Sequence, residues 1–257
     1  MFITTAGRTT QTMIEIAKKT ALDLQVPYVP REKRSVAAIT SEQDSDCFVI
    51  GKDRIELYKK NEPQPFFFHP NSAMFRVKRL QRGERDPFID AASLKEGMSL
   101  LDCTLGLASD AITASYVVGE KGKVTGIEGQ RYLSYIIENG LKTWGSGIDK
   151  MDAAMRRISV RNAEAFTYLK ELQDESYNCV YLDPMFEESI LESDGIKSLG
   201  HFALREEITS AAIEEALRIA KNRVILKDHF KSKRFKRFGF KVLVRKSAKF
   251  HFGYIEK

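Results

Sequence analysis

The chain has 257 residues and an apolar content of 43%, which is enough to bury a core in one large domain or two modest ones. No apolar run approaches the roughly twenty residues that cross a bilayer, and the opening residues lack the basic start of a signal peptide, so we expect a soluble, cytoplasmic protein. The formal net charge is +6, and its positive excess lies near the carboxyl end, which favours a polyanionic partner.

Residues 1–62 predict a small α/β domain. Gly7 and Arg8 precede its helix and indicate either a phosphate-binding turn or a plain turn. Two prolines within residues 62–65 predict a linker, so we expect a second domain over residues 63–257. The elements expected in the small domain are a strand at Phe2–Thr5, an amphipathic helix at Thr12–Leu24, a short strand at Val26–Val29 and a hairpin through Cys47–Lys59.

In the second domain, residues 98–110 form an apolar run that breaks at Gly106 and leads into a helical stretch from Ala111 to Val118, which predicts a strand, a loop and a helix. Gly106 lets the loop backbone approach a ligand closely, and the start of the helix favours an electron-rich group. The loop contains neither Gly-x-Gly-x-x-Gly nor a P-loop lysine, so the sequence argues against a dinucleotide or ATP.

The next two predicted strands also end on polar residues. A strand at Lys123–Glu128 ends on an acid that can bind both ribose hydroxyls of a nucleoside, or that caps the following helix. A third strand, at residues 157–161, is followed by Asn162 and Glu164, which can contact an adenine edge or cap a helix. Both interpretations stay open at each strand.

A fourth strand ends in the motif Asp183-Pro-Met-Phe186. Asp183 can accept a hydrogen bond from an exocyclic amino group, and Phe186 can offer its face to a base, although Asp-Pro is also an ordinary turn. A helix at Leu204–Lys221 leads to a fifth strand that ends on Lys227, which either faces the substrate or ends a solvated strand. This alternation predicts a parallel, doubly wound sheet. A final hairpin, the expected antiparallel edge, comprises Lys241–Lys246 and Lys249–Ile255.

The carboxyl-terminal residues 221–257 carry thirteen Lys or Arg against two acidic residues. Their densest part, Lys231–Arg237, interleaves Phe235 with cations, which suits phosphates together with a stacked base. A second basic stretch runs from Arg76 to Arg82. A charge run by itself usually indicates a solvated face, but in combination with the Asp183 motif these stretches favour RNA.

Cysteines and histidines do not form a metal-ligand pattern in this sequence. Their spacing and count predict buried thiols and no bound metal. These residues are Cys47, Cys103, Cys179, His69, His201, His229 and His251.

With these motifs in view, the chain resembles class I S-adenosylmethionine (SAM)-dependent methyltransferases, and it is most similar to the bacterial small-subunit rRNA guanine-N2 methyltransferase family (RsmJ-like). The similarity spans residues 66–257, and Asp183-Pro-Met-Phe186 is its most specific part, because this family has Met where other amino-group methyltransferases have a second proline. The resemblance implies a Rossmann-like fold with a seven-stranded, mostly parallel sheet whose last strand is antiparallel. Its other matching segments are Ser72–Met74, the loop from Asp102 to Asp110, Glu128 and Glu138–Leu141.

The resemblance also implies S-adenosyl-L-methionine as the cofactor and assigns roles to individual residues. The cofactor contacts implied are Asp102, Thr104, Gly106, Ser109, Asp110, Glu128, Gly129, Asn162, Glu164, Ala165 and Asp183. The catalytic residues implied are Asp183, Pro184 and Phe186. The residues expected to bind RNA are Arg76, Lys78, Arg79, Arg82, Lys227, Lys231, Lys233 and Arg234.

The chain departs from the family after each of the first three predicted strands. Ala108 and Ser109 replace a glycine and an arginine, and Gly129 replaces a basic residue. Glu164 and Ala165 stand where the family has serines. These departures leave the cofactor assignment in place and loosen the assignment of the target nucleotide.

These features predict an RNA base N-methyltransferase, and the resemblance alone implies that its target is guanine N2 of small-subunit ribosomal RNA. Asp183 and the Pro184 carbonyl would hold the amino group, and Phe186 would stack on the extruded base. One alternative keeps the reaction but has a protein or small-molecule acceptor, which accounts poorly for the basic carboxyl-terminal region. Another is a non-catalytic RNA-binding or ribosome-assembly protein on the same fold, for which the missing glycine at Ala108 is the main support.

Overall fold

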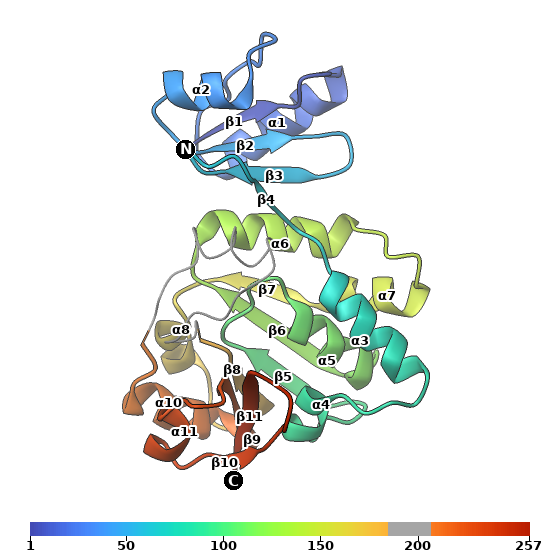
Figure 1. Cartoon of the computed structure of the whole chain (residues 1–257), viewed down its shortest axis with the longest axis vertical. Helices are drawn as coiled ribbons and strands as arrows, with labels where there is room; N and C mark the ends of the chain where they lie inside the picture. The colour runs from blue at the N-terminus through green and yellow to red at the C-terminus, as the bar shows by residue number, and fades with distance from the viewer. Residues whose placement is uncertain (185–206) are drawn as a thin grey trace. The chain divides into compact units, whose positions relative to one another are not determined.

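A computed structural model describes residues 1–184 and 207–257 of the chain (Figure 1). Contacts divide these residues into two compact units, with the division between His69 and Pro70. Each unit has its own sheet, so each is described by itself. No helix within these two described ranges is both long enough and apolar enough to cross a bilayer.

The smaller unit is built on a four-stranded sheet. Its elements are β1 (Phe2–Thr5), α1 (Gln11–Asp23), α2 (Val36–Glu42), β2 (Cys47–Ile50), β3 (Ile55–Tyr58) and β4 (Phe66–Phe67). The strand order is β1-β2-β3-β4, with β1 parallel to β2 and the other neighbours antiparallel. Thr10 starts α1 by accepting a hydrogen bond from the N–H of Met13, and the helix packs its apolar side on β1 and β2.

The first strand, the amphipathic helix and the hairpin of this unit agree with the prediction. The strand predicted at Val26–Val29 is wrong, because Tyr28 alone forms a bridge, to Ile3. Pro27 and Pro30 lie on either side of this bridge and have no N–H to donate. A ladder therefore cannot extend through this segment.

The larger unit alternates strands and helices along most of its length. Its elements are α3 (Asn71–Gln81), α4 (Pro87–Ala92), β5 (Ser99–Asp102), α5 (Ser109–Val118), β6 (Lys123–Glu128), α6 (Arg131–Thr143), α7 (Asp149–Arg157), β7 (Ser159–Asn162), α8 (Ala165–Glu171), β8 (Tyr177–Leu182), α10 (Ser210–Ile219), β9 (Ala220–His229), α11 (Arg234–Arg237), β10 (Lys241–Leu243) and β11 (Phe250–Glu256).

The larger sheet has seven strands in the order β10-β11-β9-β8-β5-β6-β7. The pairs from β9 to β7 are parallel, and β11 is antiparallel to both of its neighbours. This confirms the predicted Rossmann-like sheet with an antiparallel last strand. The expected antiparallel edge differs in one respect, because β11 is inserted between β9 and β10, so the edge strand β10 runs parallel to β9.

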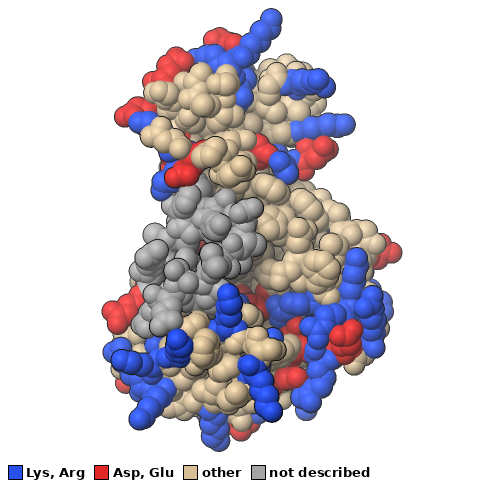
Figure 2. All heavy atoms as spheres, viewed as in Figure 1, with Lys and Arg blue, Asp and Glu red and all other residues tan. Residues whose placement is uncertain are grey.

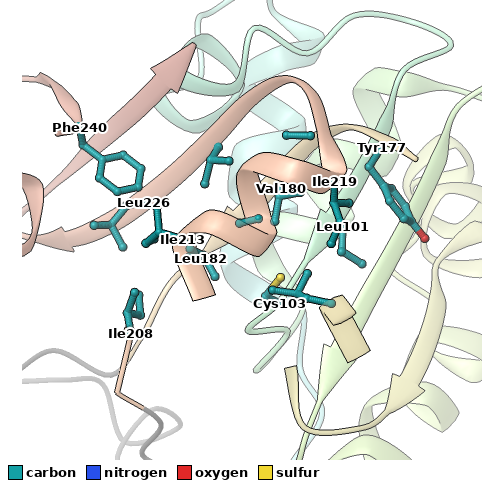
Figure 3. Packing of buried hydrophobic residues seen from close by; sticks show 14 of the residues in the cluster. Leu101, Cys103, Tyr177, Val180, Leu182, Ile208, Ile213, Ile219, Leu226 and Phe240 are labelled. Atoms are coloured by element: carbon teal, nitrogen blue, oxygen red, sulfur yellow. The ribbon is translucent and has the colours of Figure 1, made fainter. Parts of the chain in front are cut away.

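Side chains alternate between the two faces of this sheet, and β8 shows the assignment clearly. Tyr181 lies on the face covered by α4, with its ring 4.5 Å from the ring of Phe88. Val180 and Leu182 point to the opposite face, into a buried cluster that includes Ile213 of α10 (Figure 3). The central strands β5 and β8 are therefore buried on both faces, as expected of a parallel sheet, whereas the edge strands β7 and β10 are largely exposed. The three cysteine thiols are buried as predicted.

Candidate active site

The parallel strands β5, β8 and β9 end next to one another at one edge of the larger sheet. Asp102 is the last residue of β5, Asp183 follows β8, and Lys227 lies near the end of β9. The register places Asp102 opposite Tyr181, two residues before Asp183. The strand order reverses here, with β5 between β8 and β6, and open α/β sheets bind their ligands at such a point.

The ammonium group of Lys227 lies between two carboxylates. Its Nζ is 2.6 Å from Oδ2 of Asp183 and 3.5 Å from Oδ2 of Asp110. Burial lowers the pKa of Lys227, but the two carboxylates outweigh this effect and raise the pKa above its usual value, so the lysine stays charged. The sequence leaves Lys227 either facing the substrate or ending a solvated strand. In the structure its side chain is instead the counter-ion of Asp183.

Asp183 is held at both its backbone and its side chain. Its N–H donates to the hydroxyl of Thr104 at 2.7 Å, and its carboxylate accepts from Lys227. Burial raises the pKa of Asp183 to about 6, although Lys227 opposes the rise. Pro184 is buried beside it, whereas Phe186 lies outside the described residues. The result is a fixed carboxylate with a higher proton affinity than an exposed one.

The guanidinium of Arg76 joins two further buried carboxylates. Its Nε and Nη2 each lie 2.8 Å from an oxygen of Asp86, and its Nη1 lies 2.5 Å from Oδ1 of Asp110. The hydroxyl of Tyr181 donates to the other oxygen of Asp110 at 2.9 Å. Burial raises the pKa of Asp110, but Lys227 and Arg76 outweigh it and hold this pKa well below its usual range. Arg76 is thus engaged inside the protein, in place of the phosphate contact that the sequence predicts.

Two members of this network, Asp86 and Tyr181, are missed by sequence reasoning. Asp86 precedes Pro87 and caps α4 by accepting from the N–H groups of Phe88 and Ile89 at 3.0 and 3.3 Å. Asp followed by Pro is a helix-start signal that could have located the cap. Nothing local in the sequence indicates that the same carboxylate binds a guanidinium.

Asp102 is buried on the same face of the sheet, where Thr104 holds its carboxyl group. Its carboxylate accepts hydrogen bonds from the N–H of Thr104 at 3.0 Å and from its hydroxyl at 3.4 Å. Burial raises the pKa of Asp102 to about 8, and the hydrogen bond from the Thr104 backbone only partly offsets this.

Replacing Asp102 by Asn is expected to change the dependence of stability on pH. Between pH 4 and pH 8 the unfolded chain loses the Asp102 proton while the folded chain keeps it, so this group makes the wild type less stable as pH rises. Asp102→Asn removes that titration and keeps an acceptor for Thr104. Urea unfolding without cofactor measures the free energy of unfolding of both proteins. The difference in favour of the variant should grow by more than about 1 kcal/mol between pH 5 and pH 8. A gain that is independent of pH would contradict this account.

The loop between β5 and α5 contains one strained residue, Ala108, at a position where the resemblance implies glycine. Ala108, where the family has glycine, has φ 59° and ψ 19°, which is the left-handed conformation. A side chain in this conformation costs roughly 1–2 kcal/mol, whereas glycine adopts it freely. Ala108 therefore adopts, at some cost in stability, a backbone conformation that glycine would adopt without that cost.

Ala108→Gly is expected to stabilise the protein. Relief of strain exceeds the loss of one buried methyl group, which is worth about 0.8 kcal/mol, so the expected gain is roughly 0.5–1 kcal/mol. Ala153→Gly, at an exposed position inside α7, serves as the control and should lose about 1 kcal/mol. Chemical denaturation gives the free energy of unfolding of each variant, which should rise in Ala108→Gly and fall in Ala153→Gly. Equal losses of stability in the two variants would refute the strain at Ala108.

At β6 and β7 the predicted cofactor contacts have local partners. The carboxylate of Glu128 accepts from the N–H of Gln130 at 3.0 Å, and the amide of Asn162 donates to the carbonyls of Glu128 and Gly129 at 2.8 and 3.2 Å. Glu164 caps α8 by accepting from two of its N–H groups. These capping roles are one of the alternatives that the sequence leaves open, and the ribose and adenine contacts stay predictions.

The predicted RNA-binding cations differ in exposure. Arg234 is buried, with its guanidinium 3.0 Å from Oδ2 of Asp228, and Phe235 is only 5% exposed. Neither is therefore placed to contact a polyanion or to stack on a base from this position. The exposed members of the set are Lys78, Arg79, Arg82, Lys231 and Lys233.

Side chains suited to hold a metal ion do not gather in the part of the chain that the structure describes, since no group of three or more His, Cys, Asp or Glu residues is close enough. The site is instead a row of carboxylates with two paired cations at the switch point of the sheet. Such a site can receive a positively charged ligand and can hold a hydrogen-bond donor against Asp183.

Comparison with known sequences gives three findings. A family model described as "Putative SAM-dependent methyltransferase" matches residues 32–247. The protein described as uncharacterized protein YpiP from Bacillus subtilis (strain 168) is 47% identical over 254 residues, which cover 99% of this chain and 98% of that protein. Ribosomal RNA small subunit methyltransferase J of Alteromonas mediterranea is 28% identical over 174 residues, which cover 66% of this chain and 65% of that protein.

A solved structure shares the fold over the whole chain. The SAM-dependent methyltransferase NGO1261 from Neisseria gonorrhoeae aligns with 100% of this chain and 96% of its own, with a TM-score of 0.64 and 16% sequence identity. At that identity the likeness concerns the arrangement of helices and strands.

Proposed function

Because the chain belongs to the SAM-dependent methyltransferase family, we propose that it transfers the methyl group of SAM to an exocyclic amino group, guanine N2, of small-subunit ribosomal RNA. The family establishes the reaction and the cofactor; the acceptor is the proposal. The observation that carries it is the fixed carboxylate of Asp183, followed by Pro184, at the switch point of the sheet. Distant relatives that bear the name ribosomal RNA small subunit methyltransferase J support the same class of acceptor.

The residues around the switch point fit a cationic cofactor that carries a nucleoside. Asp110 supplies a buried carboxylate, and Asp102 supplies a buried carboxyl group that its raised pKa of about 8 keeps mostly protonated at neutral pH. Glu128 ends the next strand, at the position where ribose hydroxyls are bound in such sheets. When bound, SAM supplies a methyl group on positively charged sulfur, which is already a strong electrophile. The protein then has to orient the acceptor and exclude water.

Asp183 performs the central step in this proposal. Lys227 holds Oδ2 of Asp183, and we assign the other oxygen, with the Pro184 carbonyl, to the N–H groups of the acceptor amine. These two hydrogen bonds orient the nitrogen lone pair along the line of transfer. The amine becomes positively charged on methylation, and Asp183 takes the proton that it then sheds, as its raised pKa of about 6 allows.

The charge of the larger unit supports RNA as the acceptor. Figure 2 shows Lys and Arg side chains gathered over the part of this unit where Figure 1 draws α11 and β10. Nine of the residues between Asp228 and Glu256 are Lys or Arg, and none is acidic. Eight of the nine lie outside the core, since only Arg234 among them is buried. Cations on one surface attract the phosphate backbone, and binding should therefore weaken as salt is added. A small-molecule acceptor would not account for the positive charge of this segment.

Deletion of the gene tests the proposal in the cell. Small-subunit ribosomal RNA from the deletion strain should lack N2-methylguanosine at one position that the parent strain modifies, as measured by nuclease digestion and mass spectrometry. Restoration by the wild-type gene but not by an Asp183→Ala gene would support a direct role. Unchanged modification of the small-subunit RNA in the deletion strain would overturn the RNA acceptor.

A further inference from the structure

Phe230 is an exposed aromatic residue directly beyond the end of β9. The residue is 46% exposed. Its N–H donates to the carbonyl of Lys249 at 3.1 Å, which continues the ladder between β9 and β11 by one step. The backbone that carries it is thus fixed by the sheet. Lys227, which binds Asp183, lies three residues earlier on the same strand, a distance of about 10 Å along the chain.

Two buried histidines support the Phe230 ring. The ring centroid of His229 lies 4.6 Å from that of Phe230, and the centroid of His251 lies 6.2 Å from it. His229 and His251 are only 9% and 8% exposed, and Nδ1 of His251 accepts from the N–H of Arg245 at 3.4 Å. The three rings therefore form a supported aromatic surface, which we call the Phe230 platform.

Cations border the Phe230 platform. The Nζ of Lys231 lies 5.5 Å from the Phe230 centroid, and the guanidinium of Arg245 lies 4.9 Å from the ring of Phe250. Lys227 approaches the same Phe250 ring to 5.0 Å, and Phe250 is the register partner of His229 across β9 and β11. An exposed ring among Lys and Arg is the combination with which proteins bind single-stranded nucleic acid.

We propose that the Phe230 platform stacks on a base that flanks the target nucleotide, while Lys231 and Arg245 contact the adjoining phosphates. This inference rests on the proposed RNA acceptor and names a contact that holds the strand while the target base reaches Asp183. Phe230 thereby takes the stacking role that the sequence indicates for Phe235, which is buried in the core. The charge around the platform favours RNA over an apolar protein surface as the partner, because residues 229–255 contain no Asp or Glu.

Three substitutions of Phe230 separate stacking from simple apolar contact. Phe230→Leu keeps an apolar side chain without an aromatic face and should weaken binding to small-subunit RNA about tenfold, since stacking on one base is typically worth enough for such a change. Phe230→Tyr and Phe230→Trp keep the face and should bind within about twofold of the wild type. SAM affinity and the thermal midpoint should be unchanged in all three, because the ring is exposed and lies outside the carboxylate network.

Fluorescence gives a second readout that does not depend on activity. The chain has one tryptophan, Trp144, so Phe230→Trp in a Trp144→Phe background reports from the platform alone. Addition of small-subunit RNA should quench this fluorescence, whereas Leu22→Trp in the same background, at an exposed site on α1, should not be quenched. The Lys231→Gln/Arg245→Gln double variant should reduce the salt dependence of binding by about two counter-ions.

The outcomes distinguish the platform from the function on which it rests. A wild type that neither binds nor methylates ribosomal RNA would overturn both. A wild type that binds and methylates RNA, with Phe230→Leu equal to it in affinity and no quenching at Phe230→Trp, would overturn the platform alone.

Discussion

Asp183→Ala is expected to lose methyl transfer to RNA by about 10²–10⁴-fold, the range typical for removal of a group that both orients and deprotonates the acceptor. The carboxylate is held on the β8 end by Thr104 and Lys227, so its loss removes a fixed acceptor for the amine. SAM affinity should stay within a few fold, because the other carboxylates at the strand ends remain. Single-turnover rates and calorimetric titration with SAM measure the two quantities separately.

Asp183→Asn is the matched control for the charge. The amide oxygen still accepts one hydrogen bond from the amine but cannot take its proton, so this variant should retain more activity than Asp183→Ala. In the wild type, activity should fall as pH drops through about 6, because burial raises the pKa of Asp183 to about 6 and its ionised form is the one required. That acidic limb should disappear in Asp183→Asn. Wild-type rates in Asp183→Ala would remove Asp183 from the mechanism.

Arg76→Met is expected to destabilise the protein by about 3–5 kcal/mol, the usual cost of removing one partner from a buried ion pair. The Arg76 side chain is 18% exposed, and its partners Asp86 and Asp110 are 5% and 11% exposed. Both carboxylates would be left in a poorly solvated place, although Asp110 keeps Tyr181 and Lys227. Urea unfolding at neutral pH gives the free energy directly.

Arg79→Met, three residues further along α3, tests whether the effect comes from burial. Arg79 forms an ion pair of similar length, 2.8 Å, with Glu84, but the two side chains are 50% and 43% exposed. An exposed pair of this kind contributes about 0–1 kcal/mol. Equal losses in the two variants would contradict the assignment of Arg76 to a structural ion pair, and would return it to the set of cations available for RNA.

The central strands of the larger sheet, β5, β6 and β8, could be predicted from the sequence because each is a short, largely apolar run with an acidic residue at or directly after its end. Lys123–Glu128 is predicted with its observed bounds, and the order of strands and helices gives the parallel sheet. The failed strand at Val26–Val29 has a local cause as well, since its prolines limit pairing to one bridge. Prediction thus succeeds where the signal is periodic within one segment.

The ion pairs of the site could not be predicted, because they join residues distant in sequence. Arg76 and Asp110 are 34 positions apart, and Lys227 and Asp110 are 117 apart. The sequence shows their charges but not whether each charge meets solvent or a partner. The same limit explains Phe235, whose basic neighbours indicate an exposed ring although its own side chain fills the core beneath β9 and β11.

The most direct test of the central claim is transfer of radiolabelled methyl from SAM to small ribosomal subunits, and to naked small-subunit RNA, prepared from a strain that lacks this protein. The proposed function predicts label in RNA that digests to N2-methylguanosine, and little label in RNA from the parent strain, where the position is already modified. No label in either RNA substrate, from a protein that demonstrably binds SAM, would contradict the RNA acceptor.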